Sequence, residues 1–171
     1  MKISVLGAGS WGTTIAILLA NKGHQISLWE HYQEHVDMLN KHRENIKFLP
    51  GVSIPEEIVI TNNIEECLQN IECLVIVVPS HAVRAVFKRC SSLIKKGVVI
   101  VSAAKGLEQD TLSTVSQVIE SEIKSELIED IGVLSGPSHA EEVSRQVPTT
   151  VVSAAKQEKT ARFIQELFST P

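Results

Sequence analysis

The chain has 171 residues, of which 43% are hydrophobic and 21% charged, values that fit one ordinary globular domain with a single core. Its formal net charge is −4 and lysine and arginine form no continuous run, so a nucleic-acid partner is not expected. The first apolar run is short and leads directly into glycines, and no stretch approaches the ~20 apolar residues of a membrane span. We therefore expect a cytoplasmic protein that does not insert into membranes.

Short apolar runs alternate with amphipathic stretches, which is typical of an α/β fold. Strands are predicted at residues 2–6, 25–29, 58–61, 74–78, 98–102, 131–134 and 150–153. Helices are predicted to begin near Ser10, Gln33, Ile64, His81, Thr111, Ser138 and Gln157. Because several strands are apolar at almost every position, they belong in a sheet that helices cover on both faces. The sequence therefore predicts a doubly wound, mainly parallel sheet.

Local signals refine this pattern. Gly23 lies just past the first helix, where a left-handed cap favours glycine. Asp110 or Thr111 is predicted to cap the helix at residues 111–123, and the prolines and glycine of residues 47–55 indicate a loop. The cysteines, which lack the spacing of metal ligands, are interpreted as reduced thiols that fill space, and no metal site is expected; they are Cys67, Cys73 and Cys90.

A glycine-rich turn joins the first strand to the first helix. Gly7, Gly9 and Gly12 form the pattern G-x-G-x-x-G between a strand and a helix, and a second strand follows. Gly7 permits a tight turn, Gly9 lets the backbone approach a pyrophosphate, and Gly12 lets the helix pack on the sheet. The N–H groups and positive dipole end of the helix, from Ser10 onward, then bind the diphosphate. This predicts a Rossmann-type domain that binds a nicotinamide or flavin nucleotide.

The second strand ends at Glu30, 18 residues after Gly12. A carboxylate at about this distance accepts hydrogen bonds from the adenosine ribose and repels a 2′-phosphate, which favours NAD over NADP. His31 could stack on adenine or, when protonated, face a phosphate. The alternative is that Glu30 and His31 are simply solvated at the end of a strand.

Two further strand ends carry candidate ligands, because ligands of open α/β sheets bind beyond the carboxyl ends of strands. Pro79 ends the fourth strand and Ser80 can cap the next helix, so this segment is either a turn and cap or a contact with the nicotinamide side of the cofactor. Lys105 follows a nearly all-apolar strand and precedes Gly106. Its ammonium could hold an anionic substrate or polarise a carbonyl oxygen, unless it is only solvated.

The strand end at residues 134–141 combines a turn with polar side chains. Gly136 and Pro137 make a sharp strand-to-helix turn, and Ser138 with Glu141 fits a capping box. The same turn directs backbone N–H groups toward the crevice, so capping and substrate binding are compatible. His139 has no evident partner to orient it and is interpreted as a surface or loop residue.

Together these segments resemble the cofactor domain of bacterial-type NAD(P)-dependent glycerol-3-phosphate dehydrogenase. The resemblance extends over the whole chain and rests on GAGSWGT, VVPSHAVR, KGLE, SGPSHAEEV and the loop RENIKFLPGVSIPE, which are residues 7–13, 77–84, 105–108, 135–143 and 43–56. GAGxWG alone would fit many dehydrogenases, whereas the combination is specific.

The resemblance implies that dihydroxyacetone phosphate is reduced to sn-glycerol 3-phosphate with NADH or NADPH, for phospholipid synthesis, by a full-length enzyme that could form a homodimer. The positions that match cofactor contacts are Ser10, Trp11, His31, Lys105 and Ala140. The positions that match substrate contacts are Lys105, Gly136 and Ser138. Lys105 would therefore serve both ligands, in agreement with its predicted place over the crevice.

Two departures from the family pattern stand out. Members often carry a small residue where Glu30 stands, which leaves room for NADP. The carboxylate of Glu30 in this chain instead favours NAD. Members also have a second, helical domain that supplies the proton-donating lysine, and no residue here matches it. We therefore expect residues 1–171 to be one NAD(P)-binding domain, either cut from a longer enzyme or a natural truncation, which binds nucleotide but is nearly inactive alone.

Two other functions remain open on the sequence. One is a dehydrogenase of the same architecture that acts on a 3-hydroxy acid or a sugar acid, which explains the glycine turn but not KGLE together with SGPSHAEE. The other is a non-catalytic module that binds or senses NAD(P).

Overall fold

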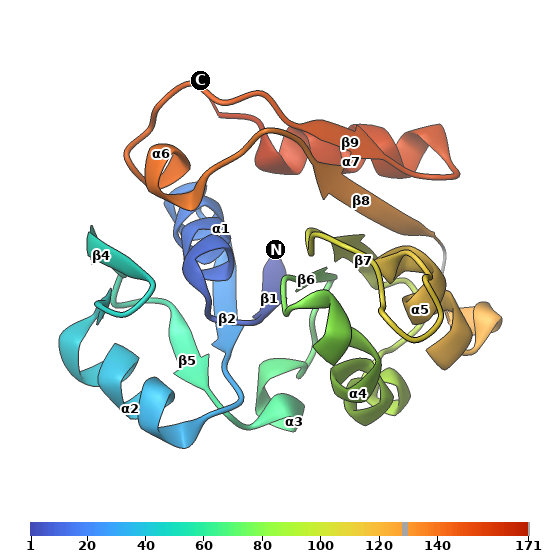
Figure 1. The fold of residues 1–171 in the computed structure, drawn as a ribbon, viewed down its shortest axis with the longest axis horizontal. Coiled ribbons are helices and arrows are strands. Elements are labelled where there is room, and N and C mark those ends of the chain that lie inside the picture. The colour runs from blue at the N-terminus through green and yellow to red at the C-terminus, as the bar shows by residue number, and fades with distance from the viewer. Residues whose placement is uncertain (128–129, 171) are drawn as a thin grey trace.

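The computed structural model describes residues 1–127 and 130–170. A seven-stranded sheet forms the centre of the molecule, in the order β5-β2-β1-β6-β7-β8-β9 (Figure 1). Its strands are β1 (Lys2–Leu6), β2 (Gln25–Trp29), β5 (Val59–Thr61), β6 (Cys73–Ile76), β7 (Val99–Ser102), β8 (Ile131–Ser135) and β9 (Val152–Ala154). Every pairing is parallel except that of β9 with β8, which confirms the predicted mainly parallel sheet.

Helices cover both faces of this sheet, also as predicted (Figure 1). One face carries α1 (Ser10–Asn21), α6 (Ala140–Ser144) and α7 (Glu158–Phe168). The other carries α3 (Ile64–Cys67), α4 (Ser80–Cys90) and α5 (Val115–Glu122). Helix α2 (Gln33–His42) lies beside β5, and short 3-10 turns occur at η1 (Ser91–Leu93) and η2 (Ser125–Leu127). Among the residues that the structure describes, no helix is both long and apolar enough to cross a bilayer.

The core consists of two hydrophobic clusters, one on each face of the sheet. Alternate side chains of one strand enter different clusters: Val75 of β6 joins the cluster under α1, whereas Leu74 and Ile76 join the cluster under α4. All three side chains are at most 1% exposed. The uniformly apolar composition of this strand is therefore explained by burial on both sides.

The segment at residues 47–55 is not the predicted loop. It contains β4 (Leu49–Ser53), which pairs in antiparallel fashion with β3 (Glu44–Asn45) to form a small separate hairpin. Leu49 and Ile54 are each 1% exposed and pack in the same cluster as α1. Because a two-stranded hairpin leaves one edge of each strand unpaired, it tolerates the proline and glycine that made this segment look irregular.

Three predicted helix caps are also wrong. Helix α5 begins at Val115 and is capped by Thr114, whose side chain forms a reciprocal capping box with Gln117, so neither Asp110 nor Thr111 is its cap. Helix α6 begins after His139 without a side-chain cap, so Ser138 and Glu141 form no capping box. Both helices therefore begin later in the chain than predicted, because the turn before each of them is longer than its cap-like residues indicated. Ser80 is likewise not a cap, because it is the first residue of α4 and Pro79 occupies the cap position.

Candidate nucleotide-binding site

A cavity of about 1230 Å³ opens at the carboxyl ends of β1, β2 and β6. Strand β1 has β2 on one side and β6 on the other, so the strand order reverses at this point. A topological switch of this kind is where open α/β sheets bind ligands. Five of the residues predicted from the sequence line the cavity: Gly7, Gly9, Glu30, His31 and Pro79. A smaller hollow of about 700 Å³, between β9 and α7, includes none of the predicted site residues.

The three glycines of the turn have different surroundings. Gly7 has a φ of +113°, and its N–H donates to the carbonyl of Trp29 at 3.0 Å, so the turn is tight and held to β2. A Cβ on Gly12 would lie 1.8 Å from the Gly7 carbonyl oxygen, so the close packing of α1 requires glycine there. A Cβ on Gly9 would meet no protein atom within 4 Å, so the packing of the chain itself does not explain glycine at this position.

The start of α1 faces the same turn. Gly9 occupies the N-cap position without a side-chain hydrogen bond, and the first turn contains no acidic residue. The first intrahelical bond runs from the Thr13 N–H to the Gly9 carbonyl at 3.0 Å, so the N–H groups of Ser10, Trp11 and Gly12 precede the helical ladder. Such a helix end is suited to an anion, and the open space at Gly9 leaves room for a diphosphate.

Glu30 and His31 lie at the end of β2, as predicted. The Glu30 side chain is 12% exposed; its Oε1 accepts from the Tyr32 N–H at 3.2 Å, and its Oε2 lies 3.3 Å from Nδ1 of His35. His31 is exposed and its ring lies edge-on to Tyr32, with centroids 4.8 Å apart. His35 was not predicted from the sequence, because its contact with Glu30 forms only when α2 folds back toward the end of β2.

Lys105, Ser138 and Ala140 are predicted site residues that lie outside the cavity lining. Lys105 Nζ donates to the Ser138 carbonyl at 3.0 Å, which joins the turn after β7 to the turn after β8. Ser138 and Ala140 are both 6% exposed. The Thr14 hydroxyl donates to the Ser10 carbonyl at 2.9 Å and lies 3.3 Å from the Ala140 carbonyl, which ties α6 to α1. Lys105, Ser138 and Ala140 are thus brought together beside the helix that follows the glycine turn.

Gly136 makes the second turn possible. Its φ is +145°, and an added Cβ would lie 2.9 Å from the carbonyl oxygen of Thr150. The backbone after β8 therefore packs against the segment leading to β9 in a conformation that favours glycine. This close approach places Ser138 within reach of Lys105.

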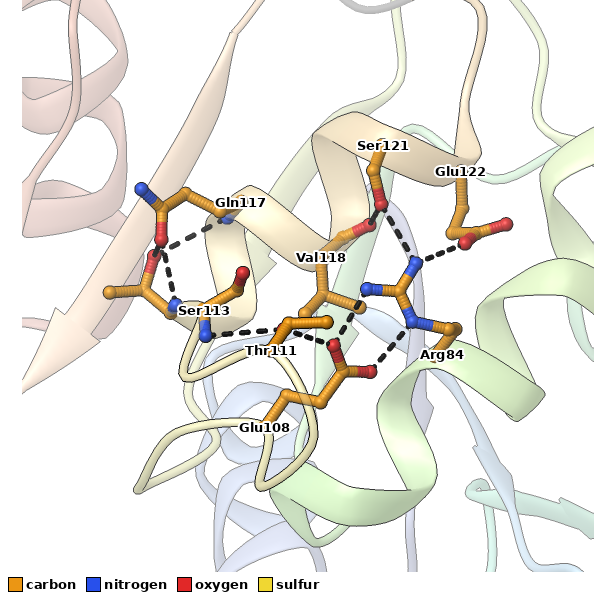
Figure 2. A network of polar contacts seen from close by, with 9 residues as sticks. Arg84, Glu108, Thr111, Ser113, Gln117, Val118, Ser121 and Glu122 are labelled. Carbon is orange, nitrogen blue, oxygen red and sulfur yellow. Dashed lines mark hydrogen bonds and ion pairs between the residues drawn. The ribbon is translucent and has the colours of Figure 1, made fainter.

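A polar network holds the loop that follows Lys105 (Figure 2). Arg84 on α4 donates through Nε and Nη2 to the two carboxylate oxygens of Glu108, each at 2.7 Å. Its Nη1 reaches Ser121 at 3.0 Å and Glu122 on α5, and the Thr111 hydroxyl donates to Glu108 at 2.5 Å. The hydrogen bonds from Arg84 and Thr111 lower the pKa of Glu108 to about 2. From the sequence, Arg84 and Glu108 were identified only within family motifs and Thr111 only as a candidate cap, while Ser121 and Glu122 were not identified.

The cysteines lie in the core and away from this site. Burial raises the pKa of each thiol to about 12, which keeps Cys67, Cys73 and Cys90 protonated at neutral pH. Across residues 1–127 and 130–170, no cluster of three or more His, Cys, Asp and Glu side chains is arranged to hold a metal ion.

The sheet order, the strand–glycine turn–helix and the cavity at the switch point define a Rossmann-type dinucleotide-binding domain. Residues 2–161 match the family model described as the N-terminus of NAD-dependent glycerol-3-phosphate dehydrogenase. The chain belongs to this family.

Curated relatives support this assignment. The chain is 44% identical over 167 residues to the NAD(P)+ glycerol-3-phosphate dehydrogenases of Agathobacter rectalis and Bacillus pumilus. These alignments cover 98% of the chain but 49% and 48% of the relatives. The chain therefore spans about half the length of the curated relatives it matches.

Solved structures give the same result. The crystal structure of glycerol-3-phosphate dehydrogenase from Coxiella burnetii superposes with a TM-score of 0.91 at 32% identity, over 99% of this chain and 51% of that one. A UDP-D-ManNAc dehydrogenase from Pyrococcus horikoshii superposes with a TM-score of 0.75 at 14% identity, a likeness that shows the fold alone.

Proposed function

We propose that this chain is the NAD(P)-binding domain of a glycerol-3-phosphate dehydrogenase, which transfers hydride between NAD(P)H and dihydroxyacetone phosphate. The observation that carries the proposal is the unfilled space at Gly9, at the uncapped start of α1 and at the mouth of the cavity. Family membership supports NAD or NADP as the nucleotide and glycerol 3-phosphate as the product.

The residues of the cavity fit an extended dinucleotide. The N–H groups of Ser10 and Trp11 would hold the diphosphate, and Glu30 and His31 would hold the adenosine at the end of β2. Pro79, after β6, lines the cavity and would contact the nicotinamide side of the cofactor. When bound, the nicotinamide supplies or accepts the hydride. We assign a preference for NAD to Glu30, because a carboxylate repels a 2′-phosphate.

Lys105 is the proposed link between cofactor and substrate. Lys105 is an exposed residue whose ammonium is anchored by the Ser138 carbonyl, so it stays near the turns after β7 and β8. There it can polarise the ketone oxygen and hold the phosphate, while the Gly136–Ser138 turn and Ala140 complete the substrate and cofactor contacts. We assign proton transfer to a lysine of a separate helical domain. The relatives are about twice as long as this chain, so they have room for such a domain.

The family context supports three further proposals. The product would serve phospholipid synthesis, the enzyme would work in the cytoplasm, and the full-length protein would form a homodimer.

Titration of the chain with NADH and NADPH, followed by nucleotide fluorescence, tests the proposal. We expect both nucleotides to bind and NADH to bind more tightly, and we expect Glu30→Ala to reduce that difference. Equal affinities in the unaltered chain would remove Glu30 as the selector, and failure of both nucleotides to bind would overturn the proposed function.

The substrate assignment needs the longer enzyme. With Lys105→Met in such a protein, we expect kcat/KM for dihydroxyacetone phosphate to fall about 10- to 100-fold, the loss associated with a hydrogen bond to a charged group. The isolated 171-residue chain should show almost no turnover. Efficient reduction of a hydroxy-acid precursor in place of dihydroxyacetone phosphate would contradict the assignment.

A further inference from the structure

Asn45 has an amide orientation that its backbone neighbours determine. Its side chain is fully buried, and Nδ2 donates to the Ala8 carbonyl at 2.9 Å and to the Thr13 hydroxyl at 2.8 Å. Its Oδ1 accepts from the Phe48 N–H at 3.3 Å. Because a carbonyl can only accept and a backbone N–H can only donate, the two ends of this amide cannot be exchanged.

This orientation determines the protonation of one ring nitrogen of His35. Nε2 of His35 lies 3.2 Å from Oδ1 of Asn45, and that oxygen is an acceptor. Nε2 must therefore carry a hydrogen and donate it. In a neutral imidazole, the other nitrogen, Nδ1, is then an unprotonated acceptor.

Nδ1 faces a second acceptor. It lies 3.3 Å from Oε2 of Glu30, and the two side chains are only 10% and 12% exposed. An ionised carboxylate and an unprotonated Nδ1 would oppose two lone pairs at this distance, so the contact is favourable when the pair holds a proton. The pair is then an imidazolium beside a carboxylate.

We propose that Glu30 and His35 share one proton, and that this proton sets the preference of the site between NAD and NADP. With the proton bound, the pair has no net charge and repels a 2′-phosphate weakly. When the proton leaves, the pair carries one negative charge and repels that phosphate more strongly. His35 is thus a positioning residue that acts through Glu30, and the inference rests on the proposed role of Glu30 in nucleotide binding.

The pair is also connected to the diphosphate end of the site. Asn45 is bonded at once to His35 and to the Ala8 carbonyl within the glycine turn, so one buried chain of hydrogen bonds joins the end of β2 to the start of α1. Rotation of His35 away from Glu30 would break its bond to Asn45. The charge state of the pair and the position of the carboxylate are therefore linked.

Other charged groups face the same cavity and contribute to its pH dependence. They come from the end of β2, the start of α2, the β3–β4 turn and α4, and they are His31, Tyr32, Glu34, Lys47, His81 and Arg89. Two of them are histidines, and the 2′-phosphate of NADP titrates as well. The experiment must therefore isolate the contribution of His35.

The test compares the NADPH-to-NADH affinity ratio of the chain at pH 6 and pH 8.5, a range that spans ordinary imidazole titration. We expect the ratio to be about five- to tenfold higher at pH 6, because a neutral pair replaces a negative one. Calorimetry in two buffers of different ionisation enthalpy should show greater proton uptake with NADPH than with NADH.

Variants identify the source of the effect. In His35→Gln, which has no titratable ring, the pH dependence of the ratio should shrink to what the phosphate and the other histidines produce. Glu30→Gln should raise the NADPH-to-NADH affinity ratio above that of the unaltered chain at both pH values. This variant also provides a second test if His35→Gln does not fold. His42→Gln is the matched control, because His42 is exposed on the same helix and lies outside the cavity lining.

The outcomes separate the inference from the proposed function. Unchanged pH dependence in both His35→Gln and Glu30→Gln, with both nucleotides still bound, would overturn the shared proton alone. Loss of all nucleotide binding in the unaltered chain would instead overturn the proposed function.

Discussion

At Gly9 and Gly12, the same residue type serves two different needs three positions apart. Gly12 is required by the protein itself, because its α-carbon approaches the Gly7 carbonyl. Gly9 has open space where a side chain would project, so its smallness matters only when a ligand is present. The motif therefore separates into a residue for folding and a residue for binding.

Alanine substitutions should distinguish the two glycines. Gly12→Ala is expected to destabilise the chain by about 1–3 kcal/mol through overpacking. Gly9→Ala should change stability by less than about 1 kcal/mol, the scale of an altered N-cap, yet weaken NADH binding at least about tenfold. Urea unfolding and fluorescence titration measure the two effects. A Gly9→Ala chain that binds NADH normally would show that no pyrophosphate approaches this position.

Sequence spacing located the residues that depend on local geometry. Gly7, Gly9 and Glu30 were identified because the strand–turn–helix–strand unit is contiguous and its spacings are fixed by its own geometry. His35 and Asn45 were not, because their importance comes from a contact between α2, the β3–β4 hairpin and the glycine turn. A histidine early in an amphipathic helix gives no sign that it faces a carboxylate.

At the scale of elements, the loop after β7 is held both by two helices outside it and by hydrogen bonds within it. Arg84 of α4 binds the Glu108 carboxylate on one side and pairs with Glu122 of α5 on the other, as Figure 2 shows. Inside the loop, the Glu108 N–H donates to the Ser113 carbonyl at 2.9 Å. Two helices therefore fix the segment that carries Lys105.

The Glu108 carboxylate should make stability depend on pH in the acid range. Its pKa is lowered from 4.5 to about 2, so the stabilisation is complete above the unfolded value and is lost as pH falls through about 2. Glu108→Gln should therefore melt at a lower temperature than the unaltered chain at pH 7, with a difference that narrows below pH 4. Thermal melts from pH 2 to pH 7 measure this, with Glu126→Gln as a control in a carboxylate outside the network. Parallel curves for the unaltered chain and Glu108→Gln would show that the ion pair does not stabilise the fold.

Element types were easier to predict than element ends. The start of α5 was expected near Thr111, but the Thr111 hydroxyl is bonded to Glu108 and the helix begins only after Thr114. Both threonines are acceptable caps by residue type. The contact of Thr111 with Glu108 is local, but the Glu108 side chain is itself held by Arg84 of α4, a tertiary contact that a single sequence does not contain.

At the scale of the whole molecule, the sheet separates two apolar clusters that share no side chains. Alternating apolar and amphipathic runs were enough to predict this layered arrangement. The antiparallel addition of β9 to β8 was not predicted, because a short exposed edge strand has the same composition in either direction. Trp11 packs against one cluster and Trp29 lies in the other, so each face has its own fluorescent residue.

Substitutions that create a small cavity on each face of the sheet should have additive effects on the free energy of unfolding. Ile15 and Ile119 are at most 1% exposed and lie in different clusters. Ile15→Val and Ile119→Val should each lower the free energy of unfolding by about 0.5–1.5 kcal/mol, and the double variant should equal their sum within about 0.5 kcal/mol. Urea unfolding followed by tryptophan fluorescence and circular dichroism gives these values. Separate midpoints for the two signals would mean that the faces unfold independently.

The position of β1 at the centre of the sheet has a consequence for the order of folding. Its pairing with β2 joins neighbours in the chain, whereas its pairing with β6 aligns Ile3 with Cys73 and closes a loop of about 70 residues. Closure of long loops slows folding. The glycine turn can therefore form early, but the cavity is completed only when Val78 and Pro79 arrive with β6. During refolding, nucleotide fluorescence should consequently appear later than the circular-dichroism signal of the helices.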